Sequence, residues 1–286
     1  MSFLSCPKQD DPFTKQVRDT YRANVVSAPR AGIDPLSALA VRGRKVEPRG
    51  QLRYLLEGPV RLPAATSDPV AGLAGVRSAA VDLNLGLGLS AKFLAALGIP
   101  VPGAEVSASL WEGATGFSFE VRDVMQHEID IGDLGRRLQG HVLARTPATE
   151  LFLTDYSVQL MLITRTLITS SFSVRAMRSG GESVKVAVDG LAKLLGKADV
   201  KVSWKTEDDH SVTFTGQSPV TFAFAAVPCA FDSARHLLFG LAREDLKFAV
   251  QPPAADSLEA RPAIDRPGLL SFDELDGQPN LGRSSG

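Results

Sequence analysis

The sequence predicts an α+β fold in which a twisted antiparallel β-sheet forms the core and short helices surround it. The first observation is a regular alternation of apolar and polar residues over residues 81–89. The second is a longer run of strand-forming residues over 156–177, and the third is that the helical patterns between the strands are short. Alternation of this kind is typical of strands that bury one face and solvate the other.

The first strand-rich region covers residues 76–125. Its clearest alternation places five apolar side chains on one face, because successive side chains of a strand point to opposite faces. A short helix is predicted at residues 91–97, and alternation resumes at 106–110 and at 117–121. The apolar residues of this region that define strand faces are Val81, Leu83, Leu85, Leu87, Leu89, Phe117 and Phe119.

A second strand-rich region covers residues 157–204 and continues into 212–224. Its segments alternate in the same way, and a short helix capped by Asp189 is predicted at residues 191–195. The strand that ends at Trp204 is expected to pair with residues 212–214 across the polar turn "TEDDH". The apolar positions of the region are Phe172, Val174, Ala176, Val184, Val186, Val188, Val200, Val202, Val212, Phe214, Phe222 and Phe224.

Three further helices are predicted at the periphery. One covers residues 13–21, and one lies within 130–142, where apolar residues recur at helical spacing and acids occupy the first turn. A third is expected to begin at Asp232, with Ala234, Leu237, Leu238 and Leu241 on its apolar side. Residues 42–53 carry five basic residues and one acid, and are interpreted as a solvated basic loop or as a contact for anionic lipid headgroups.

The chain changes character near residue 250. The segment 250–286 is punctuated by proline and carries six acids against three arginines, so its net charge is −3 while residues 1–249 are weakly basic. It is predicted to be a short segment that docks loosely on a body formed by residues 1–249. Its expected apolar anchors are Leu258, Leu269, Leu270, Phe272 and Leu275.

Composition excludes several classes of protein. The formal net charge of −1 creates no global field that would recruit nucleic acid. Two distant cysteines form no disulfide framework, and no Cys/His pair has the spacing of a zinc site. The first residues lack the basic and apolar regions of a secretory signal, and no segment has the pattern of a membrane-spanning helix.

An enzymatic function has one weak clue. Residues 86–91, "GLGLSA", match a dinucleotide-binding G-x-G-x-x-A turn, and Glu105 or Glu112 could serve as the acid that follows. The strand before this turn alternates, whereas the strand of such a site is buried on both faces and continuously apolar. His210, beside two aspartates, is interpreted as part of a polar turn. We therefore predict that the chain is not an enzyme and has no metal or cofactor.

Cys6 stands out near the start of a chain that has only two cysteines. It follows Phe3 and Leu4, and three interpretations are open: a small buried hydrophobe, a reactive thiol, or an acylation site. High reactivity is disfavoured because Lys8 is the only cation nearby.

Four ordered segments resemble bacterial gasdermins: residues 25–39, 117–138, 167–181 and 212–231. The last segment, with Gly216, Pro219, Phe222 and Phe224, is the most specific, followed by "PRAGIDPL" at 29–36. The resemblance covers roughly residues 1–245 and includes no catalytic signature. It implies a gasdermin-like pore-forming domain, monomeric and cytoplasmic at rest. It also implies that a short C-terminal segment keeps this domain inactive.

The resemblance also implies a sequence of events. A caspase-like or trypsin-like protease removes the C-terminal segment, and the body then oligomerises and inserts β-hairpins into the anionic inner membrane, which kills the cell in defence against phage. Cys6 matches the family's palmitoylated cysteine. No family cleavage residue can be matched, so the candidates are Arg243, Asp245, Asp256, Arg261, Asp265 and Arg266. The apolar residues already named on residues 81–89, 117–119, 172–174, 184–186 and 202 are the candidates for membrane-spanning strands.

An alternating strand fits the core of a soluble sheet as well as the wall of a membrane barrel, and the sequence does not distinguish these two structures. The alternatives are therefore a soluble β-rich module that binds a partner through its tail, or a nucleotide-binding enzyme that uses residues 86–91.

Overall fold

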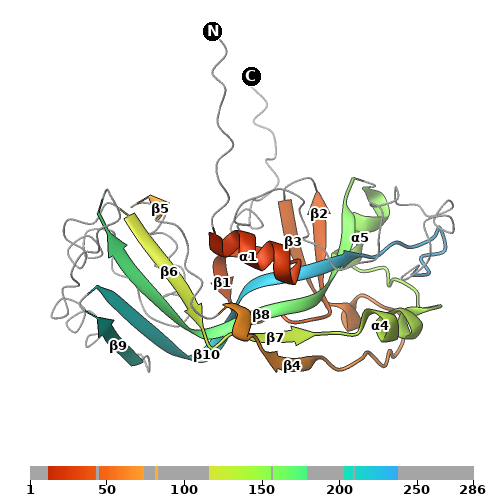
Figure 1. Cartoon of the computed structure of the whole chain (residues 1–286). Coiled ribbons are helices and arrows are strands. Elements are labelled where there is room, and N and C mark those ends of the chain that lie inside the picture. Colours follow the sequence, from red (N-terminus) through yellow and green to blue (C-terminus); the bar gives the residue numbers. More distant parts are fainter. Residues whose placement is uncertain are drawn as a thin grey trace, which may run out of the picture.

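The computed structural model describes residues 12–42, 45–73, 81–82, 116–155, 157–178, 203–208 and 210–237 of the 286-residue chain. Figure 1 shows one long, strongly curved sheet with short helices against it. The elements are α1 (Pro12–Tyr21), β1 (Asn24–Arg30), β2 (Ser37–Arg42), β3 (Lys45–Gln51), η1 (Leu52–Tyr54), β4 (Thr66–Pro69), η2 (Ala71–Leu73), β5 (Val81–Asp82), β6 (Gly116–Arg122), β7 (Met125–Glu128), α4 (Ile131–Leu138), α5 (Pro147–Thr154), β8 (Gln159–Met177), β9 (Ser203–Asp208) and β10 (Ser211–Pro228). The predicted α+β class with an antiparallel sheet is confirmed.

Two long strands form the spine of the sheet. β8 has 19 residues and β10 has 18, and they pair antiparallel from Ser211↔Arg175 to Pro228↔Met161. β-branched and aromatic residues are frequent in both, as strands of this length require. The spine runs through the middle of the molecule, so every other described strand except β3, β4 and β5 is placed by pairing directly with β8 or β10.

The edge of β8 that faces away from β10 pairs with three strands in succession. β2 pairs with residues 159–162, β7 with 165–168 and β6 with 171–177. On the other edge of the spine, β9 pairs with the start of β10 and β1 with its middle. Figure 1 shows the result: β6 and β9 lie at one end of the sheet, and β2, β3, α4 and α5 lie at the other.

Register shifts interrupt the pairing of β8 with β10 at three places, between Thr215 and Val220, Thr221 and Ala223, and Ala225 and Ala226. Each extra residue increases the local twist of the strand. The sheet therefore bends between its two ends.

The main core lies at the α4/α5 end of the sheet. It gathers buried apolar side chains of β2, η1, α4, α5, β8 and the end of β10, among them Leu134, Phe152 and Phe231. A smaller cluster on the other side of the sheet joins β1, β2, β3, the start of β8 and the last part of β10. This end of the molecule therefore has its own packed core.

α1 is held on the sheet by two kinds of contact. Phe13 and Val17 are fully buried, and the Phe13 ring lies 6.0 Å from the ring of Phe222 on β10. The Arg165 guanidinium of β8 donates to the Tyr21 carbonyl at 2.7 Å and also binds the Glu128 carboxylate of β7. The prediction of a helix over residues 13–21 is confirmed.

The helix predicted within 130–142 is also confirmed as α4. Asp130 caps it by accepting from the Asp133 backbone at 2.6 Å, and Leu134 and Leu138 are fully buried. α5 was not predicted. Pro147 occupies its first turn, and the Thr146 backbone donates to the Thr149 hydroxyl at 2.9 Å.

The interpretation of residues 42–53 as a loop is wrong. Residues 45–51 form β3, an edge strand paired with β2 in the register Val41↔Val46, and residues 52–54 form η1. The apolar strand β2 requires a partner on this side, and Val46 is buried beside it. The charged residues Glu47 and Arg49 and the proline Pro48 suit an edge, because they discourage further strand pairing.

The helix predicted to begin at Asp232 does not form over the described part of that segment. Residues 232–237 make a closed turn. The Asp232 backbone donates to the His236 carbonyl at 3.0 Å, the His236 backbone donates to the Asp232 carboxylate at 2.8 Å, and Arg235 has φ 70°. Phe231 and Leu237 form an isolated bridge and are both buried. The apolar residues Phe231 and Leu237 therefore hold a turn against the core. Leu238 and Leu241 lie outside the described residues.

Several sequence predictions fall on residues that the structure does not describe. They include most of the first alternation (Leu83, Leu85, Leu87 and Leu89), the helices at 91–97 and 191–195, the "GLGLSA" turn, and Val184, Val186 and Val202. Cys6, every cleavage candidate and the segment 250–286 are also outside the described residues.

Candidate functional site

One end of the sheet has two chemically opposite faces. This region, here called the amphipathic sheet, consists of β6, residues 171–177 of β8 and residues 211–215 of β10. The strand registers align its residues in rows across the three strands. Val121 lies opposite Phe172 and Phe172 opposite Phe214, while the next row along joins Glu120, Ser173 and Thr213.

The described side chains of the apolar face are buried. All are no more than 2% exposed, and the Phe172 and Phe214 rings stack with their centroids 5.4 Å apart. The members of this face are Val121, Phe172, Val174, Ala176, Val212 and Phe214.

The opposite face carries hydroxyl and charged groups in three rows. The Ser173 and Thr213 hydroxyls bond across the strand pair, Thr215 reaches Ser171 at 3.4 Å, and Arg122 lies 3.4 Å from the Glu120 carboxylate. The rows are Ser118, Arg175 and Ser211; Glu120, Ser173 and Thr213; and Arg122, Ser171 and Thr215.

The structure brings together part of the predicted set of membrane-strand residues. Phe172 and Val174 lie on the apolar face of β8, and the backbone register places Phe117 and Phe119 on β6 opposite Ala176 and Val174. Val81 begins the short strand β5, which pairs with β6. β9 pairs with β10 in the predicted manner, with Trp204 opposite Phe214. The pairing across "TEDDH" is therefore confirmed.

The apolar positions of this sheet were predictable from the sequence, but its polar face was not predicted. Its serines and threonines stand between the apolar residues that were identified, so alternation contained the signal. What the sequence did not show is that three strands distant in the chain align their hydroxyls in common rows, because register depends on tertiary pairing.

The basic segment 42–53 has less free charge than its sequence suggests. Arg42 binds Asp155 and Arg49 binds Glu47. Arg53 instead lies over the Tyr54 ring at 5.5 Å, and Tyr54 is 70% exposed. An exposed tyrosine beside an arginine combines an apolar body with polar and cationic groups, which suits a membrane interface.

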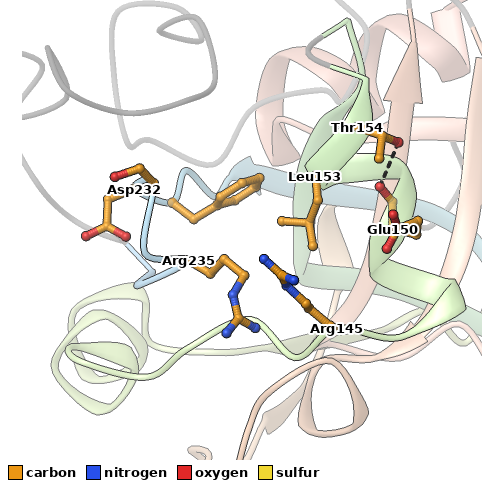
Figure 2. Close-up of a pocket in the computed structure, with 8 residues that line it drawn as sticks. Arg145, Glu150, Leu153, Thr154, Asp232 and Arg235 are labelled. Carbon is orange, nitrogen blue, oxygen red and sulfur yellow. Dashed lines mark hydrogen bonds between the residues drawn. The ribbon is translucent and has the colours of Figure 1, made fainter.

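A pocket of about 400 Å³ lies between α5 and the turn that follows β10 (Figure 2). The lining residues are Arg145, Glu150, Leu153, Thr154, Phe231, Asp232, Ser233 and Arg235. Arg235 is fixed by hydrogen bonds of 2.6 Å to the Glu57 carboxylate and the Leu143 carbonyl. Burial opposes ionisation of Asp232, but hydrogen bonds from His236 outweigh it and lower the pKa of this carboxyl below its ordinary value.

Within the described residues, no three His, Cys, Asp or Glu side chains gather as a metal site would require, and no helix has both the length and the apolar character to cross a membrane. Cys229 is fully buried, and this burial raises the pKa of its thiol to about 12, so it is a poor nucleophile.

A sequence model described as "Bacterial Gasdermin Family" matches residues 26–236. That range begins in β1 and ends in the turn after β10, so it contains all three strands of the amphipathic sheet.

Similar proteins agree with this match. The curated gasdermin bGSDM of Vitiosangium sp. (strain GDMCC 1.1324) is 26% identical over 87% of this chain and 93% of its own length. The gasdermin bGSDM of Lysobacter enzymogenes is 27% identical over 74% of this chain and 78% of its own. A solved bacterial gasdermin from Bradyrhizobium tropiciagri superposes with a TM-score of 0.59 at 13% identity, covering 92% of this chain and 97% of the other. The structural match identifies the same fold.

Proposed function

The chain belongs to the bacterial gasdermin family, a non-enzymatic family of pore-forming proteins, and from this premise we propose that it is an autoinhibited pore-forming protein activated by proteolysis. Removal of the C-terminal segment would allow the body to oligomerise and insert β-hairpins into the inner membrane. The death of the infected cell would then limit phage.

The amphipathic sheet is the observation that carries this proposal. A strand that crosses a membrane must present apolar residues to lipid and can present polar residues to a water-filled lumen, and every backbone group must pair with a neighbouring strand. Phe172, Val174, Val212 and Phe214 supply an apolar surface, and the three polar rows supply its opposite. Three neighbouring strands already share this arrangement.

Strand length sets a second requirement. A membrane-crossing strand needs about 9–11 residues, and β6 has 7. The alternating residues of 83–89 and 184–202 would extend the strands next to the amphipathic sheet. Longer hairpins could form from these residues.

The resting state would depend on the segment 250–286. Docking about five large apolar side chains yields roughly 7–15 kcal/mol, which is comparable to the entropic cost of ordering some twenty residues. Retention would then rely on the covalent connection, and cutting that connection would release the segment. The candidates for the cut remain the six residues named above, for a caspase-like or trypsin-like protease.

Membrane delivery would be assisted by a palmitoyl group on Cys6 and by anionic lipids. Each buried methylene contributes about 0.8 kcal/mol to membrane binding. The exposed pair Arg53 and Tyr54 supports an interfacial contact. We place the resting monomer in the cytoplasm and the active homo-oligomer in the inner membrane.

Dye release from vesicles tests the proposal directly. A site for a sequence-specific protease is inserted after residue 249 of the full chain, and vesicles containing anionic phospholipid are loaded with a fluorophore. We expect release only after cleavage, with the cleaved body sedimenting as an oligomer. A cleaved body that stays monomeric and leaves the vesicles sealed contradicts pore formation.

Two variants on opposite faces make this test specific. Val174→Lys places a charge on the apolar face, where it would meet lipid at a cost of about 2–4 kcal/mol in each subunit near the bilayer centre. Thr213→Lys places the same charge on the polar face. We expect at least a tenfold loss of release for the first and a change within about twofold for the second. Both are compared below the temperature at which either uncut chain loses its native circular dichroism.

A further inference from the structure

The pocket between α5 and the turn after β10 has an apolar side and a cationic side. Leu153 of α5 and Phe231 contribute the apolar surface, Arg145 and Arg235 contribute positive charge, and Glu150 and Asp232 contribute two carboxylates. Figure 2 shows the Arg145 side chain reaching toward Arg235, while the Asp232 carboxylate points away from both. The combination suits a ligand that carries carboxylates beside apolar groups.

Arg145 is the least constrained charge in this pocket. Its guanidinium has no hydrogen-bond or ion-pair partner within the part of the chain that the structure describes. Arg235, in contrast, is held by Glu57 and by the Leu143 carbonyl, and Asp232 is engaged by His236. Glu150 is the remaining carboxylate of the lining and is exposed on α5. A carboxylate that enters the pocket therefore has Arg145 available to it.

We propose that residues 269–276 of the C-terminal segment occupy this pocket, with acidic side chains at Arg145 and apolar side chains against Leu153 and Phe231. This contact would hold the body inactive, and that regulatory consequence rests on the proposed function. The cross-linking test of the contact does not depend on pore formation. The occupant is part of the same chain, so no other molecule is required.

Two observations favour this occupant. The sequence of residues 269–276, "LLSFDELD", holds half of the six acids of the segment 250–286 and four of its five predicted apolar anchors. The described chain also ends at Leu237, four residues after the pocket residue Ser233. The segment is therefore tethered at the edge of the pocket, which keeps its local concentration high.

A disulfide trap tests occupancy in the full chain. Leu153→Cys and Phe272→Cys are introduced together with Cys6→Ala, and Cys229 is left in place because it is fully buried. Under mild oxidation we expect the pair to cross-link at least about tenfold faster than a control pair, Ser67→Cys with Phe272→Cys. Ser67 is exposed on β4, which does not line the pocket. Equal rates for the two pairs overturn the proposal.

Exchanging the charges of Arg145 and of the acids Asp273 and Glu274 tests the proposed ion pairing between them. Arg145→Glu added to the trap should slow cross-linking by about fivefold, since an exposed ion pair contributes up to about 1 kcal/mol. Asp273→Lys with Glu274→Lys should slow it similarly, and the combination of all three changes should restore it. The control is Arg136→Glu, because Arg136 is exposed on α4 outside the pocket. A combination that cross-links no faster than its parents contradicts the pairing.

The docking contact and pore formation can each fail without the other. Fast cross-linking with no dye release after cleavage would confirm the contact and contradict pore formation. Dye release without cross-linking would contradict the contact alone. Protection of Arg145 from a guanidinium-modifying reagent by vesicles of anionic phospholipid, but not by the intact C-terminal segment, would also overturn the contact and identify a lipid occupant instead.

Discussion

Three threonines on β8 differ in how well their buried hydroxyls are satisfied. Thr164 and Thr166 are at most 1% exposed, and neither hydroxyl has a hydrogen-bond partner among the described residues. Thr169 is also buried, but its hydroxyl lies 2.8 Å from the Ser171 carbonyl and accepts from the Ser171 backbone at 2.9 Å. Thr164 stands where the register with β10 shifts. Unsatisfied groups in the middle of the spine lower the stability of the resting fold.

The first prediction follows from this contrast. Thr166→Val keeps the shape of the side chain and removes an unpartnered hydroxyl, so we expect the free energy of unfolding to rise by about 1 kcal/mol. Thr169→Val removes a satisfied hydroxyl and should lower it by about 1–3 kcal/mol. Urea unfolding followed by circular dichroism measures both. A loss of stability in Thr166→Val would indicate a bridging water at this site.

The second prediction concerns the two thiols. Burial raises the pKa of Cys229 to about 12, so at pH 8 almost none of it is thiolate in the folded chain. With a disulfide reagent we expect this thiol to react only after denaturation. Palmitoylated Cys6 would not react at all, so the native protein should give no fast thiol and Cys6→Ala should match it. One fast thiol in native protein purified from its own host would contradict acylation.

At the scale of elements, local patterns predicted well where one period dominated. β8, the β9–β10 hairpin, α1 and α4 followed from alternation, from helical spacing and from the acids in the first turn of α4. β3 was not predicted because charged residues at this density are typical of a loop. It forms a strand because it pairs with β2. The spacing of apolar residues after Asp232 predicted a helix, but residues 232–237 form a turn. Phe231 and Leu237 meet across this turn, a contact that spacing alone does not show. The apolar half of the amphipathic sheet was predictable from alternation, while its alignment across β6, β8 and β10 was not.

The third prediction tests how firmly β8 and β10 are joined in the amphipathic sheet. Phe172 and Phe214 are buried and stacked, so Phe214→Ala should cost about 3–5 kcal/mol of unfolding free energy through the cavity it leaves. Phe172→Ala should behave alike. In a double-mutant cycle by urea unfolding, the two changes should couple by about 0.5–1.5 kcal/mol. Strict additivity would show that the rings contribute only through separate burial.

For the whole molecule, the two ends of the sheet differ in a way that suits a conformational switch. The end with α4 and α5 has a compact core, and the other end presents two opposite faces built from paired strands. In the proposed activation, the first end would stay folded while the strands of the second extend, and the register shifts of the spine lie between the two ends. A covalently attached segment of marginal affinity would then be enough to decide which state is populated.

The fourth prediction follows from that marginal affinity. If the segment 250–286 is retained mainly by its covalent connection, the cleaved body should be held inactive only by a concentration of free segment near the effective concentration of the tether, which is in the millimolar range for short flexible connections. We therefore expect a synthetic peptide of residues 250–286 to delay dye release by cleaved protein at millimolar concentration and to have no effect at micromolar concentration. A peptide with Asp273→Lys and Glu274→Lys should require several-fold more, whereas a scrambled peptide of equal charge should not delay release at all.

Full inhibition at micromolar peptide would show that the segment binds tightly by itself. Activation would then need more than severing the chain, because the cut segment would remain in place.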